Sequence, residues 1–177
     1  MKYLILTLCA LFGGCAGADY PPLDVVDRVD VQRYLGVWHE IARLPNSFQK
    51  HCACSKAEYS IIDESTLRVV NSCNEDTPEG EIDVANGKAF IVEGSNNAKL
   101  RVQFFWPFRG DYWIIELDDD YQWVVVGTPS REYLWILARE QQLDDPTYTM
   151  LLQRIAKKGF DTSKLIRREE GCGEGKE

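Results

Sequence analysis

The chain has 177 residues, which is enough for one domain with one sizeable core. Apolar residues make up 45% of the sequence and charged residues 27%, so the composition is that of a globular protein and excludes a disordered or multi-span membrane chain. The net charge is −8, which does not match the basic surfaces that bind nucleic acid, so no nucleic-acid partner is expected.

The first fourteen residues have the pattern of an export signal. The apolar run at residues 3–12 is too short to span a bilayer. Two cleavage positions are open: small residues would suit a cut before Asp19, whereas Gly14 directly before Cys15 resembles a bacterial lipobox. We favour the lipobox, in which Cys15 carries the acyl chains that tether the protein to a membrane. The sequence is thus divided into a lipoprotein signal peptide (1–14), an anchor and extended arm (15–31) and one domain (32–177).

The six cysteines also indicate export. One lies in the signal, Cys15 becomes the anchor or is trimmed away, and four remain at positions 52, 54, 73 and 172. An even set in an oxidising compartment predicts two disulfides, and four cysteines allow three pairings. A structural zinc site is disfavoured, because Cys52 and Cys54 have a single spacer residue and the chain has only two histidines. Neither a metal nor another cofactor is expected.

Short apolar or alternating runs recur from residue 36 onward, separated by turn residues, and predict eight β-strands. Many runs are β-branched and aromatic, as at residues 123–126. Eight strands at this spacing indicate an antiparallel sandwich or a barrel, whose closure removes exposed edges. The expected strands span residues 36–44, 55–62, 66–73, 81–92, 99–106, 112–118, 122–127 and 133–139.

One helix follows the strands. Asp144 and Asp145 precede Pro146, which is tolerated in a first helical turn. Apolar residues then recur at helical spacing over residues 148–155, and two lysines followed by Gly159 end the helix. A short strand near residue 165 precedes an acidic tail, with neither an internal repeat nor a second domain.

Three segments, in order and at the expected separations, resemble the sequence motifs of the lipocalins. The resemblance covers residues 30–170 and is greatest to bacterial outer-membrane lipocalins, with apolipoprotein D more distant. It implies an all-β fold, an eight-stranded antiparallel up-and-down β-barrel with one C-terminal α-helix packed outside. The motif residues are Gly36 and Trp38 in the first segment, Asp118 and Tyr121 in the second, and Arg139 in the third.

We interpret these motif residues as structural. Trp38 and Arg139 are expected to meet at the closed end of the barrel, where the guanidinium can lie over the indole and bond nearby carbonyls. Asp118 to Tyr121 is expected to form a tight turn at the same end. The motifs therefore identify the fold and give no ligand signature.

Alternation along the strands predicts which residues line the barrel. Every second residue of a barrel strand faces inward, and we take Trp38 and Arg139 as the reference. The resulting wall is aromatic and apolar, and it suits an acyl chain or another elongated apolar ligand; the alternative is a core filled by these side chains. The candidate lining residues are Ala57, Tyr59, Leu100, Val102, Phe104, Tyr112, Ile114, Tyr133, Trp135 and Leu137.

The segment at residues 105–110 is unusually apolar for a loop, and counting loops places it at the open mouth. Trp106 and Phe108 could cap the ligand, touch a membrane surface or pack against a second subunit in a homodimer. The alternative is a loop folded onto its own barrel.

The resemblance also suggests a pairing for the four cysteines. Apolipoprotein D-like chains imply a bond between Cys54 and Cys172, and some bacterial lipocalins imply one between Cys52 and Cys73. Spacing around the hairpin alone would permit Cys54–Cys73 nearly as well.

The sequence favours a binding protein over an enzyme. It contains no Gly-x-Ser-x-Gly elbow, phosphate loop or His-Glu-x-x-His motif. We expect an exported lipid-binding protein of the bacterial outer membrane that stores or transports fatty acids or lysophospholipids in the envelope. The alternatives are a periplasmic or secreted carrier of another small hydrophobic ligand, an isomerase-type enzyme on the same fold, and a structural envelope protein whose barrel is filled.

Overall fold

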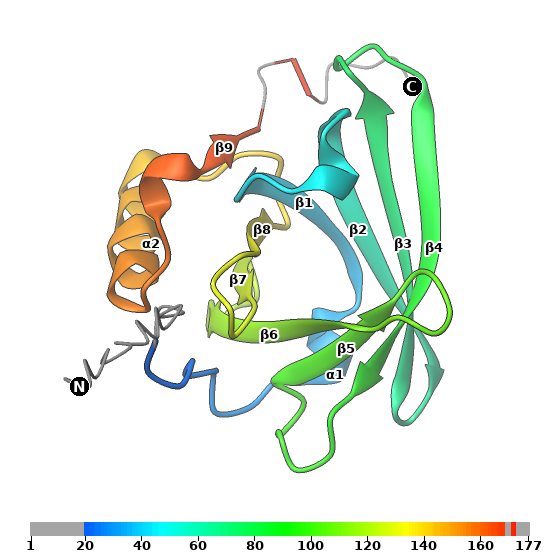
Figure 1. Cartoon of the computed structure of the whole chain (residues 1–177), viewed down its shortest axis with the longest axis vertical. Coiled ribbons are helices and arrows are strands. Elements are labelled where there is room, and N and C mark those ends of the chain that lie inside the picture. Colours follow the sequence, from blue (N-terminus) through cyan, green and yellow to red (C-terminus); the bar gives the residue numbers. More distant parts are fainter. Residues whose placement is uncertain (1–19, 169–170, 173–177) are drawn as a thin grey trace, which may run out of the picture.

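The computed structural model describes residues 20–168 and 171–172, so the expected signal peptide and Cys15 lie outside the described residues. Nine strands form one sheet in the order β2-β3-β4-β5-β6-β7-β8-β1-β9, and a further pairing between β2 and β1 closes it into a barrel (Figure 1). All paired strands are antiparallel. The eight-stranded barrel with one main helix outside it confirms the expected fold class.

The strands follow the expected runs, and the two largest differences, of three residues each, are at the start of β2 and the end of β5. β2 begins at Cys52, before the expected residue 55, because Cys52 and Ala53 pair with the end of β3. β5 ends at Gln103, before residue 106, because the chain turns toward β6, with Phe108 N donating to Phe105 O at 2.9 Å. The strands are β1 (Gly36–Arg43), β2 (Cys52–Asp63), β3 (Thr66–Glu75), β4 (Ile82–Ile91), β5 (Lys99–Gln103), β6 (Gly110–Leu117), β7 (Trp123–Gly127), β8 (Leu134–Ala138) and β9 (Ile166–Arg167).

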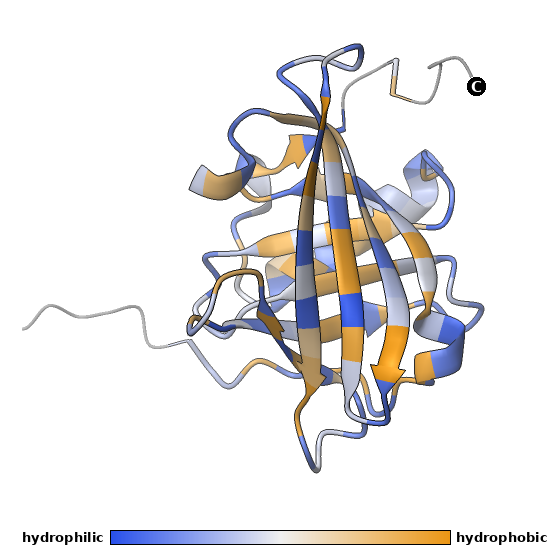
Figure 2. Ribbon diagram, turned by 90° about the vertical axis from the view of Figure 1, so that its right-hand side faces the viewer, coloured by the Kyte–Doolittle hydropathy of each residue, from blue (hydrophilic) through white to orange (hydrophobic). Residues whose placement is uncertain are grey.

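The barrel wall separates two hydrophobic clusters. One lies in the lower interior of the barrel, and the other lies between the wall and α2 (Asp145–Lys157). In β7, Val124 and Val126 face the interior, whereas Val125 faces the helix. This alternation follows from the two-residue period of a strand, and Figure 2 shows it as changes of colour along the long strands.

Helix α2 is capped and amphipathic. The Asp144 carboxylate accepts a hydrogen bond from Thr147 N at 2.9 Å, which satisfies one free donor of the first turn. Leu151 and Ile155 are fully buried against the outer face of the barrel, and each such side chain stabilises the fold by about 1.5–3 kcal/mol. No helix in residues 20–168 and 171–172 is long and apolar enough to cross a membrane.

The arm packs closely onto the barrel. It is extended, with Val26 N donating to Ile114 O and Val29 N to Asn96 O, both at 3.0 Å. The short helix α1 (Val31–Tyr34) follows, capped by the Asp30 carboxylate, and brings Tyr34 into the interior cluster. Helix α1 was not predicted, because four residues are too few to give a periodic signal. The arm and α1 together cover one end of the barrel.

Candidate ligand-binding site

The closed end is built around Trp38 of β1. Its side chain has no exposed surface, and its indole N–H donates to Tyr34 O at 2.8 Å. The Arg139 guanidinium lies 3.7 Å from the centre of the indole ring and donates to the carbonyls of Val37 and Arg33, both at 2.7 Å. The cation is thus held by a π face and by backbone oxygens, the arrangement expected from the motifs.

The turn between β6 and β7 ties the arm to this end. Tyr121 N donates to Asp118 O at 2.9 Å, and Gln122 N donates to the Asp118 carboxylate at 3.1 Å. The Tyr121 hydroxyl accepts from Asp30 N at 2.8 Å, and the Arg33 guanidinium lies 4.2 Å from the centre of its ring. Tyr121 therefore orients the start of α1, a role that its place in the turn did not reveal.

The structure places nine of the ten candidate lining residues in or against the interior cluster. Tyr133 is the exception: it precedes β8, and its ring centre lies 6.1 Å from that of Trp135 and 5.6 Å from that of Phe48. It belongs to an aromatic group at the open end, where the β1–β2 and β7–β8 connections meet. Five further buried interior residues were not predicted, because they lie on strands to which no inward face had been assigned: Leu67, Val69, Ala89, Val124 and Val126.

Three phenols form a hydrogen-bonded group in the lower interior. The Tyr34 and Tyr112 hydroxyls are 2.7 Å apart, and the Tyr59 hydroxyl donates to that of Tyr112 at 2.9 Å. Burial raises the pKa of Tyr59 to about 12, and it raises the pKa values of Tyr34 and Tyr112 well above their usual range. All three side chains are therefore neutral at pH 7.

Small residues line the wall nearer the mouth. Register places Ala57 opposite Asn71 and Asn71 opposite Ala85, so these three share the inner face with Trp38. A Cβ atom at Gly87 would lie 2.8 Å from the Phe104 ring, so Phe104 packs inside the barrel against this glycine. Ala57 and Ala85 therefore project less into the interior than Tyr59 does at the level below.

A polar network lies inside the wall near the β1–β2 connection. The buried Glu40 carboxylate pairs with Arg43 at 2.6 Å and accepts from the Gln49 side-chain amide at 2.8 Å. The Gln49 side-chain oxygen accepts from the Trp135 indole N–H at 2.8 Å. Glu40 is thus a satisfied structural acid, and the connection is fixed to the inner wall. Gln49 carried no signal in the sequence, because its partners are on other strands.

Two disulfides lie at the start of β2. They join Cys52 to Cys73 and Cys54 to Cys172, with Cα–Cα distances of 5.3 and 5.2 Å, and are the pairs that the resemblance implied. The first links β2 to β3, and the second attaches the C-terminal tail across a sequence separation of 118 residues. Covalent links therefore reinforce the open end.

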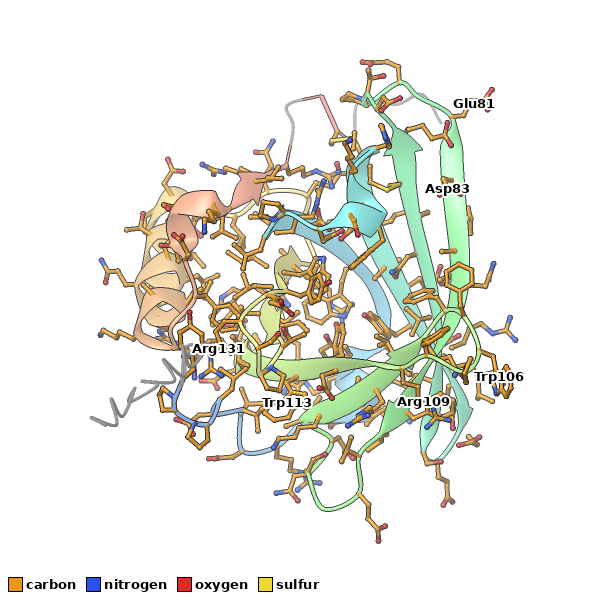
Figure 3. The ribbon with its side chains drawn as sticks, in the orientation of Figure 1. Glu81, Asp83, Trp106, Arg109, Trp113 and Arg131 are labelled. Carbon is orange, nitrogen blue, oxygen red and sulfur yellow. A yellow bond between two sulfur atoms is a disulfide. The ribbon has the colours of Figure 1, made fainter. Side chains whose placement is uncertain are left out.

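The loop between β5 and β6 carries exposed aromatic side chains. Phe105, Trp106 and Phe108 are 78%, 86% and 76% exposed, so they do not fold back onto the barrel. Figure 3 shows Trp106 pointing away from the wall. Arg109 anchors the loop, with its guanidinium 3.9 Å from the centre of the Phe90 ring. Exposed apolar side chains gathered on one loop are a feature of surfaces that contact a partner or a membrane.

Comparison with known proteins agrees with this architecture. Residues 29–170 match the family model described as a lipocalin-like domain. The chain is 38% identical over 159 residues to temperature-induced lipocalin-1 of Arabidopsis thaliana, covering 81% of this chain and 80% of that protein. It is 36% identical over 168 residues to the outer membrane lipoprotein Blc of Vibrio cholerae, covering 94% and 97%. Insecticyanin from Manduca sexta has the same fold, with a TM-score of 0.67, 22% identity and 85% coverage of both chains.

Proposed function

Because the chain belongs to the lipocalin family, we propose that it is a non-catalytic carrier that holds one fatty acid or lysophospholipid inside its barrel. The observation that supports this proposal is the hydrophobic cluster inside the barrel, which nine of the ten candidate lining residues join or pack against. Binding rests on burial, since each methylene group that leaves water contributes about 0.8 kcal/mol. The carrier would store or transport lipid in a bacterial envelope.

The distribution of polar groups suggests how the lipid lies. The lower interior offers neutral phenols, whereas the charged pair of Glu40 and Arg43 lies near the mouth. Burying an unpaired charge is costly, so the charged head group stays at the open end and the acyl chain points toward the base.

We propose that Cys15 anchors the protein to the outer membrane. Its support is the lipobox-like position after Gly14 and the similarity to a protein named outer membrane lipoprotein. The exposed loop carrying Trp106 and Phe108 would then touch the membrane surface while lipid enters the barrel. Mass measurement of the mature N-terminal peptide tests the anchor, since a diacylglyceryl cysteine at position 15 is expected and a free Asp19 would contradict it.

Native mass spectrometry after mild purification tests the ligand. We expect bound fatty acid or lysophospholipid, recovered chemically unchanged after incubation. Delipidated protein should bind added hexadecanoic acid in a fluorescence displacement assay. Absence of both results would contradict the proposed function, and turnover of the lipid would support an enzyme.

A matched pair of variants on β4 locates the bound lipid. Ala85 faces the interior by register, whereas its neighbour Val84 faces outward. Ala85→Phe should weaken hexadecanoic acid binding by about tenfold or more, because a ring occupies the path of the chain. Val84→Phe adds the same ring outside the barrel and should leave binding unchanged. Equal effects would place the ligand elsewhere.

A further inference from the structure

The three interior phenols have one more proton than their mutual hydrogen bonds use. Tyr34, Tyr59 and Tyr112 carry three hydroxyl protons, and two hydrogen bonds join them. Within residues 20–168 and 171–172, no other group accepts a hydrogen bond from these hydroxyls. One O–H donor is therefore left for an acceptor that is not part of the protein.

Burial makes this free donor consequential. Tyr34, Tyr59 and Tyr112 are 1%, 3% and 7% exposed, so the group lies almost wholly out of solvent. The raised pKa values keep all three groups protonated in neutral solution. A buried polar group without a partner is unfavourable by about the full cost of removing it from water, so an acceptor that reaches this position is bound favourably.

A second unpartnered polar atom faces the same interior. The Asn71 side-chain oxygen is buried and has no hydrogen-bond partner. Register places Asn71 opposite Ala57, two residues along β3 from Val69, which is opposite Tyr59. A strand rises about 3.3 Å per residue, so the amide oxygen belongs to the next level toward the mouth. The apolar interior thus offers one donor near its base and one acceptor above it.

We propose that the barrel selects acyl chains that carry a neutral oxygen group near their methyl end, such as a hydroxyl or a ketone. This inference rests on the proposed function, because it concerns the inner end of the same bound chain. The phenol group donates its spare proton to the ligand oxygen, and the head group remains at the mouth. A plain acyl chain would instead place a methyl group against the free donor.

The charges around the phenols favour a neutral oxygen over a carboxylate. Burial raises the pKa of Tyr34, and the positive charge of Arg139 acts in the opposite direction. The two terminal nitrogens of Arg139 already donate to the carbonyls of Arg33 and Val37. It lies against Trp38, so it is held at the closed end. Among the residues that the structure describes, an ionised head group at this depth would find one spare donor and no free cation, which does not compensate for its lost hydration.

The test compares hexadecanoic acid with 16-hydroxyhexadecanoic acid, measured by titration calorimetry on the delipidated full chain. The wild-type protein should bind the hydroxylated acid more tightly than the plain acid. In the triple variant Tyr34→Phe/Tyr59→Phe/Tyr112→Phe, the plain acid should bind tighter by about tenfold, because the added hydroxyl then has no donor. Tyr148→Phe, on the outer helix, is the matched control and should retain the wild-type preference.

Two outcomes distinguish failure of this inference from failure of the proposed function. If both acids bind and their affinity ratio is the same in the wild-type and triple variant, the inference is wrong and the carrier function stands. If neither acid binds the wild-type protein, the carrier function is wrong and the inference fails with it.

A spectroscopic test needs no variant, in case the triple substitution prevents folding. A ¹³C-labelled ketone in 15-oxohexadecanoic acid should absorb at lower infrared frequency when bound than in an alkane solvent, because it accepts a hydrogen bond. An alkane-like frequency in the bound state would overturn the inference.

Discussion

The two ends of the barrel are stabilised by different means. At the closed end, Trp38 is fully buried. Its indole N–H and the Arg139 guanidinium both donate to backbone carbonyls. At the open end, two disulfides hold the start of β2, and the β5–β6 loop exposes three aromatic side chains. Packing therefore closes one end, whereas covalent links hold the other without filling it. Under the proposed function, the open end is where lipid would enter the barrel.

The largest expected effect is at the closed end. Trp38→Ala removes a fully buried indole and the surface on which Arg139 rests, so the free energy of unfolding should fall by about 3–5 kcal/mol. Phe48→Ala, at the open end, removes a ring that is 63% exposed and should change it by less than about 1 kcal/mol. Urea unfolding followed by circular dichroism measures both. Equal losses of unfolding free energy in the two variants would contradict the conclusion that packing stabilises the closed end more than the open end.

Local pattern was enough to predict most of this architecture. The strands alternate with period two, and α2 has a capped N-terminus and a helical stripe, so both could be located from neighbouring residues alone. The two-residue alternation, counted from Trp38 and Arg139, predicted nine residues that lie in or against the interior cluster. The motif residues Trp38 and Arg139 were expected to meet because the resemblance specified it.

What could not be predicted depends on contacts between distant segments. The phenol group combines Tyr34 from α1 with residues of β2 and β6, and Gln49 joins Glu40 of β1 to Trp135 of β8. No local period marks such residues. The loop at Phe105 was expected to be at the mouth, but its exposure became visible only once the barrel was assembled.

The disulfides provide the second prediction. Replacing Cys54 and Cys172 together by Ser should lower stability by about 2–4 kcal/mol, because the bond closes a long loop in the unfolded chain. Replacing Cys52 and Cys73 together should cost about 1.5 kcal/mol less, because their sequence separation is 21 rather than 118 residues. Urea unfolding under non-reducing conditions measures the difference. A larger loss for the shorter loop would contradict the loop-entropy explanation.

The phenols predict a loss of stability in alkali. Tyrosine ionises near pH 10 in the unfolded chain, whereas burial raises the pKa of Tyr59 to about 12 in the folded protein. This contribution is thus fully present below pH 10 and is lost as the pH rises toward 12, by about 3 kcal/mol for Tyr59. Urea unfolding at pH 8, 10 and 11 measures the decline. The triple Phe variant should show a shallower decline, and identical slopes would contradict the assignment.

The geometry of the Arg139 fork gives a smaller effect. Arg139→Lys keeps the positive charge near Trp38 but cannot donate to the carbonyls of Arg33 and Val37 in the same plane. We expect a loss of about 1–2 kcal/mol in unfolding free energy. Arg101→Lys, in an exposed ion pair with Asp111, is the control and should change stability by less than about 0.5 kcal/mol. If Arg139→Lys leaves the free energy of unfolding unchanged, the positive charge alone is enough to stabilise this end.

The smallest effect concerns the exposed loop, and it separates the two ends by function. In a Cys15→Ser background, which removes the proposed lipid anchor, Trp106→Ala should weaken association with anionic liposomes by about two- to tenfold. The reason is that Trp106 is 86% exposed and can enter the interface between head groups and acyl chains without unfolding the loop. Val37→Ala removes a 37% exposed apolar side chain at the closed end and should leave liposome association unchanged. Co-sedimentation at several lipid concentrations measures both. If both variants bind as the wild-type chain does, the loop does not contact membrane; if both weaken equally, contact is not confined to the open end.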